Sequence, residues 1–142
     1  MQITLRVRLS TSSNSEVGPK IIGWAYDITD APLTGTERQV TWAEAIRAAS
    51  IEDFVDAVAL RQARLPDGRW LKNATHMTSD VQALVATING MIAKRLTPSL
   101  ATATSAKTWL EAAGGAKTMS TVKVIIRAAQ NRELSERGPP NV

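Results

Sequence analysis

The chain has 142 residues, is 44% hydrophobic and 21% charged, and contains no cysteine and one histidine. This length suits one domain with a modest core. The lack of cysteine excludes disulfides, thiolate nucleophiles and cysteine metal sites. No run of about 18 apolar residues is present, so we expect no membrane partner. Residues 1–10 lack the apolar core of a signal peptide, so we expect a cytoplasmic protein or one in an assembled particle.

Positive charge is concentrated in the second half of the chain. Residues 1–60 carry five basic and eight acidic side chains, a balance of −3, whereas residues 61–142 carry twelve basic and five acidic ones, a balance of +7. A basic half indicates a polyanion or an acidic protein surface as partner. The alternative interpretation is a solvated polar face.

Residues 1–41 predict strands and loops. Apolar Ile3, Leu5, Val7 and Leu9 alternate with polar residues, as in a half-buried strand. A loop at residues 11–20 precedes a second strand at 21–28, and a loop at 30–36 precedes a candidate third strand at 38–41. Two or three strands alone are marginally stable, so helices or another chain must cover this sheet.

Residues 42–96 predict helices. Thr41 and Glu44 have the spacing of a capping box, and the apolar pattern continues to Leu65. Residues 55–72 also fit a β-hairpin that turns at Pro66-Asp67-Gly68, so both alternatives remain open. The clearest helix is residues 79–96, which begins after Thr78 and ends at Thr97-Pro98.

The remaining sequence predicts a linker at residues 97–105, a helix pair within 106–134 and a tail at 135–142. Strands followed by helices indicate an α+β fold: one domain, residues 1–142, with a small N-terminal antiparallel sheet of two or three strands and four or five helices. Each of the four tryptophans is expected to anchor a buried cluster.

The sequence offers little catalytic chemistry. His76, with Asp80 to orient it, is the one candidate general base, and its polar loop favours a structural or solvated role. No histidine cluster has metal-ligand spacing. Residues 114–118 resemble a phosphate loop but lack its first glycine and its preceding strand. We therefore expect no enzyme activity, no metal and no cofactor.

The C-terminal helix pair suggests a helix-turn-helix, with glycine in the turn and an apolar stripe in the second helix. Side chains suited to phosphates and base edges lie in this segment. The nucleic-acid-binding candidates are Lys117, Ser120, Thr121, Lys123, Arg127, Gln130 and Asn131.

The favoured hypothesis is a structural, interacting subunit of a larger assembly. Its partners would be copies of itself or other subunits, because an N-terminal strand at a sheet edge can pair with another chain. The assembly-edge candidates are Ile3, Leu5, Arg6, Val7, Arg8 and Leu9. By analogy, virus and phage particles contain many small, cysteine-free subunits of this kind. The alternative is a DNA-binding protein that uses residues 107–134.

Overall fold

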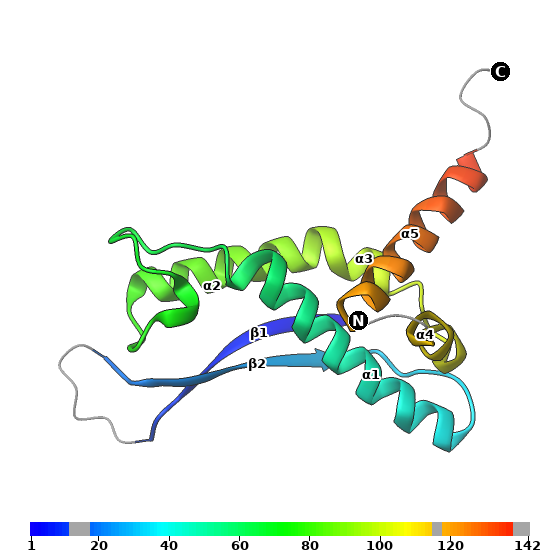
Figure 1. Cartoon of the computed structure of the whole chain (residues 1–142), viewed down its shortest axis with the longest axis horizontal. Helices are drawn as coiled ribbons and strands as arrows, with labels where there is room; N and C mark the ends of the chain where they lie inside the picture. Colours follow the sequence, from blue (N-terminus) through cyan, green and yellow to red (C-terminus); the bar gives the residue numbers. More distant parts are fainter. Residues whose placement is uncertain (12–17, 115–117, 138–142) are drawn as a thin grey trace.

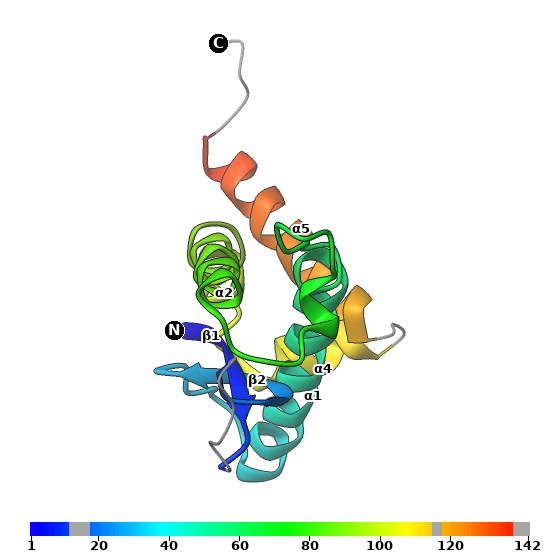
Figure 2. The ribbon, with the colours of Figure 1, turned by 90° about the vertical axis from the view of Figure 1, so that its left-hand side faces the viewer.

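A computed structural model describes residues 1–11, 18–114 and 118–137, with only the backbone at 118–120 and 133–137. It has the expected α+β architecture, in which a two-stranded antiparallel sheet at the N-terminus is followed by helices (Figure 1). Figure 2 shows α1 (Glu37–Val55) and α2 (Ser79–Met91) beside the sheet, and the last turns of α5 (Thr118–Arg137) extend away from the rest. One cluster of buried side chains joins the sheet to these helices.

The sheet pairs β1 (Gln2–Leu9) with β2 (Ile21–Thr29), as the alternation predicts. Ile3 lies opposite Ile28, and Leu5 lies opposite Tyr26. These apolar side chains belong to the core or pack against it, whereas alternate residues such as Arg6 and Asp27 belong to the polar face. The helices therefore cover one face of a sheet that is too small to be stable alone.

The candidate third strand at residues 38–41 is wrong, because helix α1 (Glu37–Val55) already includes them. Its cap is Thr36, whose hydroxyl accepts from the Gln39 backbone while the Gln39 side chain accepts from the Thr36 backbone. Thr41 is not the cap, since its hydroxyl donates to the Glu37 carbonyl inside the helix. Gly35, at φ +144°, makes the turn into the helix, a conformation that favours glycine.

Residues 55–72 combine both predicted alternatives. A π-helical turn at Asp56–Leu60 extends α1, so the first part is helical. A short hairpin follows around the predicted Asp-Gly turn: the Leu65 amide donates to the Arg69 carbonyl, and Arg64 bridges Trp70. The helical interpretation therefore holds as far as Leu60, and the hairpin interpretation holds beyond Ala63.

The helix that begins at Ser79 does not end at Thr97-Pro98. Helix α2 (Ser79–Met91) passes into a π-helical turn at Ile92–Leu96 and then into α3 (Thr97–Leu100). In an α-helix, proline lacks the amide hydrogen for the backbone bond and clashes with the carbonyl four residues before it. Here a π-helical turn precedes Pro98, and its wider hydrogen-bond spacing changes the backbone geometry at that point. The predicted linker at 97–105 is therefore wrong in its first four residues, which are helical.

The last two helices are α4 (Ala106–Ala113) and α5 (Thr118–Arg137). Helix α1 packs against both of them, and α3 packs against α5. The tail expected at residues 135–142 is wrong for 135–137, because the helix continues to Arg137, and residues 138–142 lie outside the described part.

The four tryptophans do not share the role expected of them. Trp109 is fully buried and Trp24 packs against the core. Trp42 is 64% exposed and Trp70 is 39% exposed, so the prediction that each anchors a buried cluster is wrong for these two. The Arg64 guanidinium instead lies over the Trp70 ring, with Cζ 4.0 Å from the ring centroid.

Candidate interaction surfaces

The predicted assembly edge on β1 is closed at its centre by a side chain from α2. The Leu5 amide donates to Asn89 Oδ1 at 2.7 Å, and Asn89 Nδ2 donates to the Leu5 carbonyl at 3.0 Å. The primary amide of Asn89 therefore bonds Leu5 as the backbone of a neighbouring strand would. A partner strand would have to displace Asn89 in order to pair along the whole of β1.

The candidate side chains of β1 fall on both faces of the sheet. Ile3 and Leu5 are buried, and Val7 is half-buried. Arg6, Arg8 and Leu9 are exposed, and Arg6 Nε lies 2.9 Å from Asp27 Oδ2. The hydrogen bond from Arg6, and to a lesser extent its charge, lower the pKa of Asp27 against an opposing effect of burial. The polar face is therefore held by an ion pair across the two strands.

The outer edge of β2 is open beyond its first residues. Because Leu5 turns its backbone groups away from β2, its partner Tyr26 must turn its own groups away from β1. The same alternation directs the amides and carbonyls of Trp24 and Ile28 outward. Only the start of β2 is covered, where the Ile21 amide donates to the Thr75 carbonyl.

Within the described part of the chain, no other element forms a hydrogen bond with the outward groups of Trp24, Tyr26 or Ile28. Ile22, the extra residue where the register shifts, is 55% exposed beside this edge. The sequence contains no signal for the difference between the two edges, because the difference depends on Asn89, which is 84 residues from Leu5.

The second predicted surface, on α5, presents several of its candidates to solvent. Lys123, Arg127, Gln130 and Asn131 are exposed, and so is Arg132, which the sequence reasoning did not include. None of the three cations forms an ion pair with a described residue. Val122 and Ile125 are buried and Ile126 packs against the core, as the apolar stripe predicts.

The three remaining nucleic-acid-binding candidates are Lys117, Ser120 and Thr121. Thr121 is fully buried, so its hydroxyl lies in the interior rather than on the basic face. Lys117 lies outside the described residues, and for Ser120 only the backbone is described. Among the side chains that the structure describes, the exposed basic face of α5 begins at Lys123.

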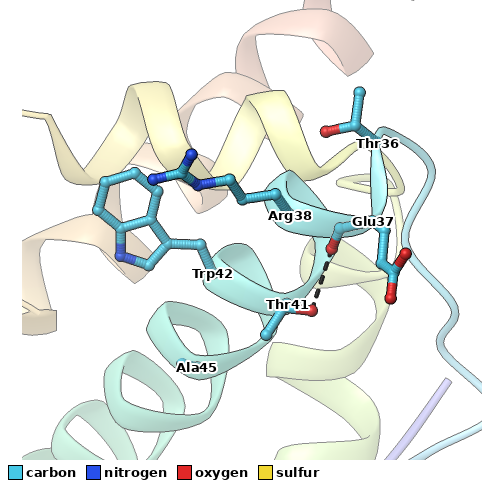
Figure 3. Close-up of a pocket in the computed structure, with 6 residues that line it drawn as sticks. All are labelled: Thr36, Glu37, Arg38, Thr41, Trp42 and Ala45. Carbon is cyan, nitrogen blue, oxygen red and sulfur yellow. Dashed lines mark hydrogen bonds between the residues drawn. The ribbon is translucent and has the colours of Figure 1, made fainter.

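A third surface lies at the beginning of α1 and is shown in Figure 3. Residues 36–45 line an open hollow of about 820 Å³, in which Arg38 and Trp42 project in the same direction from successive turns. The residues that line it contain no histidine or other general base apart from the exposed Glu37. This hollow presents an exposed indole and a guanidinium for contact.

The candidate general base, His76, lies in a segment that is bonded to the start of β2. His76 pairs through its backbone with Lys20, and its Nδ1 lies 3.0 Å from the Thr75 hydroxyl. No contact joins the His76 and Asp80 side chains in the described structure. No three histidine, aspartate or glutamate side chains are grouped closely enough there to hold a metal ion. No described helix is long and apolar enough to cross a membrane.

Asp56, from the acidic group at residues 52–56, has a structural role. Its carboxylate accepts hydrogen bonds from Lys72 and Arg61, which tie the end of the long helix to the turn at Leu71–Asn73. Burial raises the pKa of Asp56, but the hydrogen bonds and charges of Lys72 and Arg61 outweigh burial and leave the pKa below its ordinary value.

Comparisons with known proteins assign no family: no protein-family model matches the chain, and no curated protein or solved structure matches it.

Proposed function

We propose that the protein is a non-enzymatic structural subunit that associates with copies of itself, or with other subunits of a larger assembly, through the outer edge of β2. A virus or phage particle is the kind of assembly proposed, by analogy with the small and chemically plain subunits that build such particles. The observation that carries the proposal is the open edge of β2 in a sheet of only two strands.

An open edge favours association because its amides and carbonyls offer a template for another strand. The outward groups of Trp24, Tyr26 and Ile28 form such a template. Asn89 already occupies the centre of the β1 edge, so the free template is on β2 alone. A strand added there would enlarge a sheet that is marginal at its present size.

Exposed apolar side chains support contacts in more than one direction. Ile22 is 55% exposed at the hairpin end of the sheet, and Trp42 is 64% exposed near the start of α1. The hairpin end of the sheet and the start of α1 lie on opposite sides of the view in Figure 1. A subunit with several neighbours needs apolar contacts on separate sides, and burial of one such side chain contributes about 1.5–3 kcal/mol.

The test is the mass in solution of the wild-type protein and of two variants, measured by light scattering over a range of concentrations. Ile22→Lys places a charge beside the β2 edge, where lysine opposes strand pairing. We expect it to weaken association about tenfold or more. Val124→Lys is the matched control, since it adds the same charge at a similar exposure on α5. Equal association of wild type and Ile22→Lys would contradict the proposal.

A second candidate function is nucleic-acid binding by α5. The exposed side chains of Lys123, Arg127 and Arg132 form no ion pairs with described residues, and their charges are therefore available to phosphates. Exposed Gln130 and Asn131 belong to the side-chain types that bond base edges.

Its test is the salt dependence of duplex DNA binding by the double variant Lys123→Ala/Arg127→Ala. Loss of two phosphate contacts predicts weaker binding and a salt slope that is shallower by about 2. The double variant Lys94→Ala/Arg95→Ala removes two exposed cations from the end of the π-helical turn and serves as the control. Unchanged affinity in the first variant would exclude α5 as a nucleic-acid surface.

A further inference from the structure

Arg47 of α1 is a buried cation with few partners. Its side chain is on the core face of the helix, between the buried Ala43 and Ile51, and the residue is only 8% exposed. Nη1 donates to the Ala31 carbonyl at 2.7 Å. Nε is enclosed and has no hydrogen-bond partner, and no other described group bonds the guanidinium.

A buried guanidinium normally has a carboxylate or another anion beside it, because removal of a charge from water is costly. Among the described residues, no carboxylate forms an ion pair with Arg47. Burial lowers the pKa of Arg47, and the nearby charge of Glu44 opposes this effect. A guanidinium nevertheless keeps its proton in proteins, so the positive charge remains.

A cavity of about 210 Å³ opens beside this guanidinium. It is enclosed by the loop before α1, the end of α3 and the segment that follows α3. Its lining residues are Met1, Asp30, Ala31, Pro32, Leu33, Arg47, Leu100, Ala101, Ala103 and Thr104. The walls are mostly apolar. Asp30 is the one acid among them, and its residue is exposed to solvent whereas Arg47 is not.

Asp30 also belongs to the loop that reaches Arg47. Its φ of +53° is in the left-handed region, which aspartate tolerates better than most residues. The next residue, Ala31, supplies the carbonyl that accepts from Nη1. One end of the guanidinium is therefore held in place, and no described carboxylate neutralises its charge.

We infer that this cavity binds a small monocarboxylate with a short apolar chain, whose carboxylate neutralises Arg47. A guanidinium forms short, charge-assisted hydrogen bonds with a carboxylate. One buried positive charge balances one negative charge. A phosphate dianion would leave a surplus charge among apolar walls and would meet the charge of Asp30. The apolar lining and the small volume suit a chain of a few carbons.

The probe is sodium propionate, titrated into the full chain at constant ionic strength with sodium chloride as the balancing salt. We expect a saturable rise in Tm of about 4 °C at ten times Kd. In a spectrum of backbone amides, shifts should be confined to the residues that line the cavity. Inorganic phosphate at the same ionic strength should produce a smaller response.

Two variants of α1 complete the test. Arg47→Met removes the charge but keeps a long side chain, and it should abolish the response to propionate. Arg38→Met, an exposed arginine of the same helix, should leave the response unchanged. If Arg47→Met does not fold, the amide shifts of the wild-type protein decide alone. The inference is overturned by a wild-type protein that gives no saturable response, by an equal response in Arg47→Met, or by tighter binding of phosphate than of propionate.

Discussion

Replacement of Asn89 by alanine should both destabilise the fold and open the second edge of the sheet. The side chain makes two hydrogen bonds to Leu5, at 2.7 and 3.0 Å, in a partly buried position. Loss of two such bonds costs about 2 kcal/mol, and the Leu5 amide and carbonyl left without partners add about 1 kcal/mol. Alanine returns about 0.6 kcal/mol through its higher helix propensity. The expected net loss is about 2 kcal/mol.

The assay is urea denaturation of wild type, Asn89→Ala and the control Gln82→Ala. Gln82 is an exposed residue of the same helix, so its replacement should change stability by no more than about 0.5 kcal/mol. An Asn89→Ala loss as small as that of the control would refute the role assigned to the amide.

Light scattering supplies a second readout for the same variants. Removal of the amide frees the centre of the β1 edge, which then offers a second template for strand pairing. Asn89→Ala should therefore associate more strongly than wild type at equal concentration, while Gln82→Ala should not. Asn89→Asp should lie between wild type and the alanine variant at neutral pH, because an ionised carboxylate accepts from the Leu5 amide but cannot donate to its carbonyl.

Three further predictions concern stability measured by denaturation. Trp109→Ala should cost about 3–5 kcal/mol, because the indole is fully buried and donates to the Ala103 carbonyl, whereas Trp42→Ala, at 64% exposure, should change stability by no more than about 0.5 kcal/mol. Equal losses would contradict the assignment of these residues to core and surface. Tyr26→Phe should leave stability unchanged or raise it by up to about 1 kcal/mol, because the Tyr26 hydroxyl is enclosed without a described partner; a clear loss would reveal a partner. Asp56 has a lowered folded-state pKa, so its stabilising effect is present above about pH 4 and is lost as the pH falls through that lower value. The stability difference between wild type and Asp56→Asn should therefore shrink below about pH 4, and a difference that stays constant with pH would contradict this role.

The local patterns of the sequence were sufficient to predict an element where one of its faces is buried. The alternation of Ile3, Leu5 and Val7 predicted β1, and the spacing of Val122 and Ile125 predicted the buried stripe of α5. Both patterns arise from local geometry, since side chains alternate along a strand and recur every three or four residues along a helix.

Element boundaries depended on contacts between distant segments. The sequence offers two capping boxes, one starting at Thr36 and one at Thr41, and the second lies inside α1. The first is used because Thr34 is fixed by the segment at residues 104–106, to which its amide and carbonyl are bonded. The prediction that the helix ends at Thr97-Pro98 used the rule that proline interrupts an α-helix. A π-helical turn at Ile92–Leu96 precedes the proline, so the rule does not hold there.

The candidate surfaces were the least accessible to sequence reasoning. An asparagine on a mostly apolar helix gave no indication that it closes a strand edge, and this contact decides which edge is free. Arg47 did carry a signal, because it follows Ala43 by four residues and precedes Ile51 by four, which puts a charge on the apolar face. Its cavity, however, is formed by loops far from it in sequence.

The proposed association requires an open outer edge on β2, and amide hydrogen exchange tests that edge directly. The outward amides of Trp24, Tyr26 and Ile28 should exchange readily in dilute protein and become protected as concentration rises and subunits pair. The amide of Ala25, which points toward β1, should be protected at all concentrations. Exchange of the outward amides that does not change with concentration, in a protein that remains monomeric, would contradict the central claim.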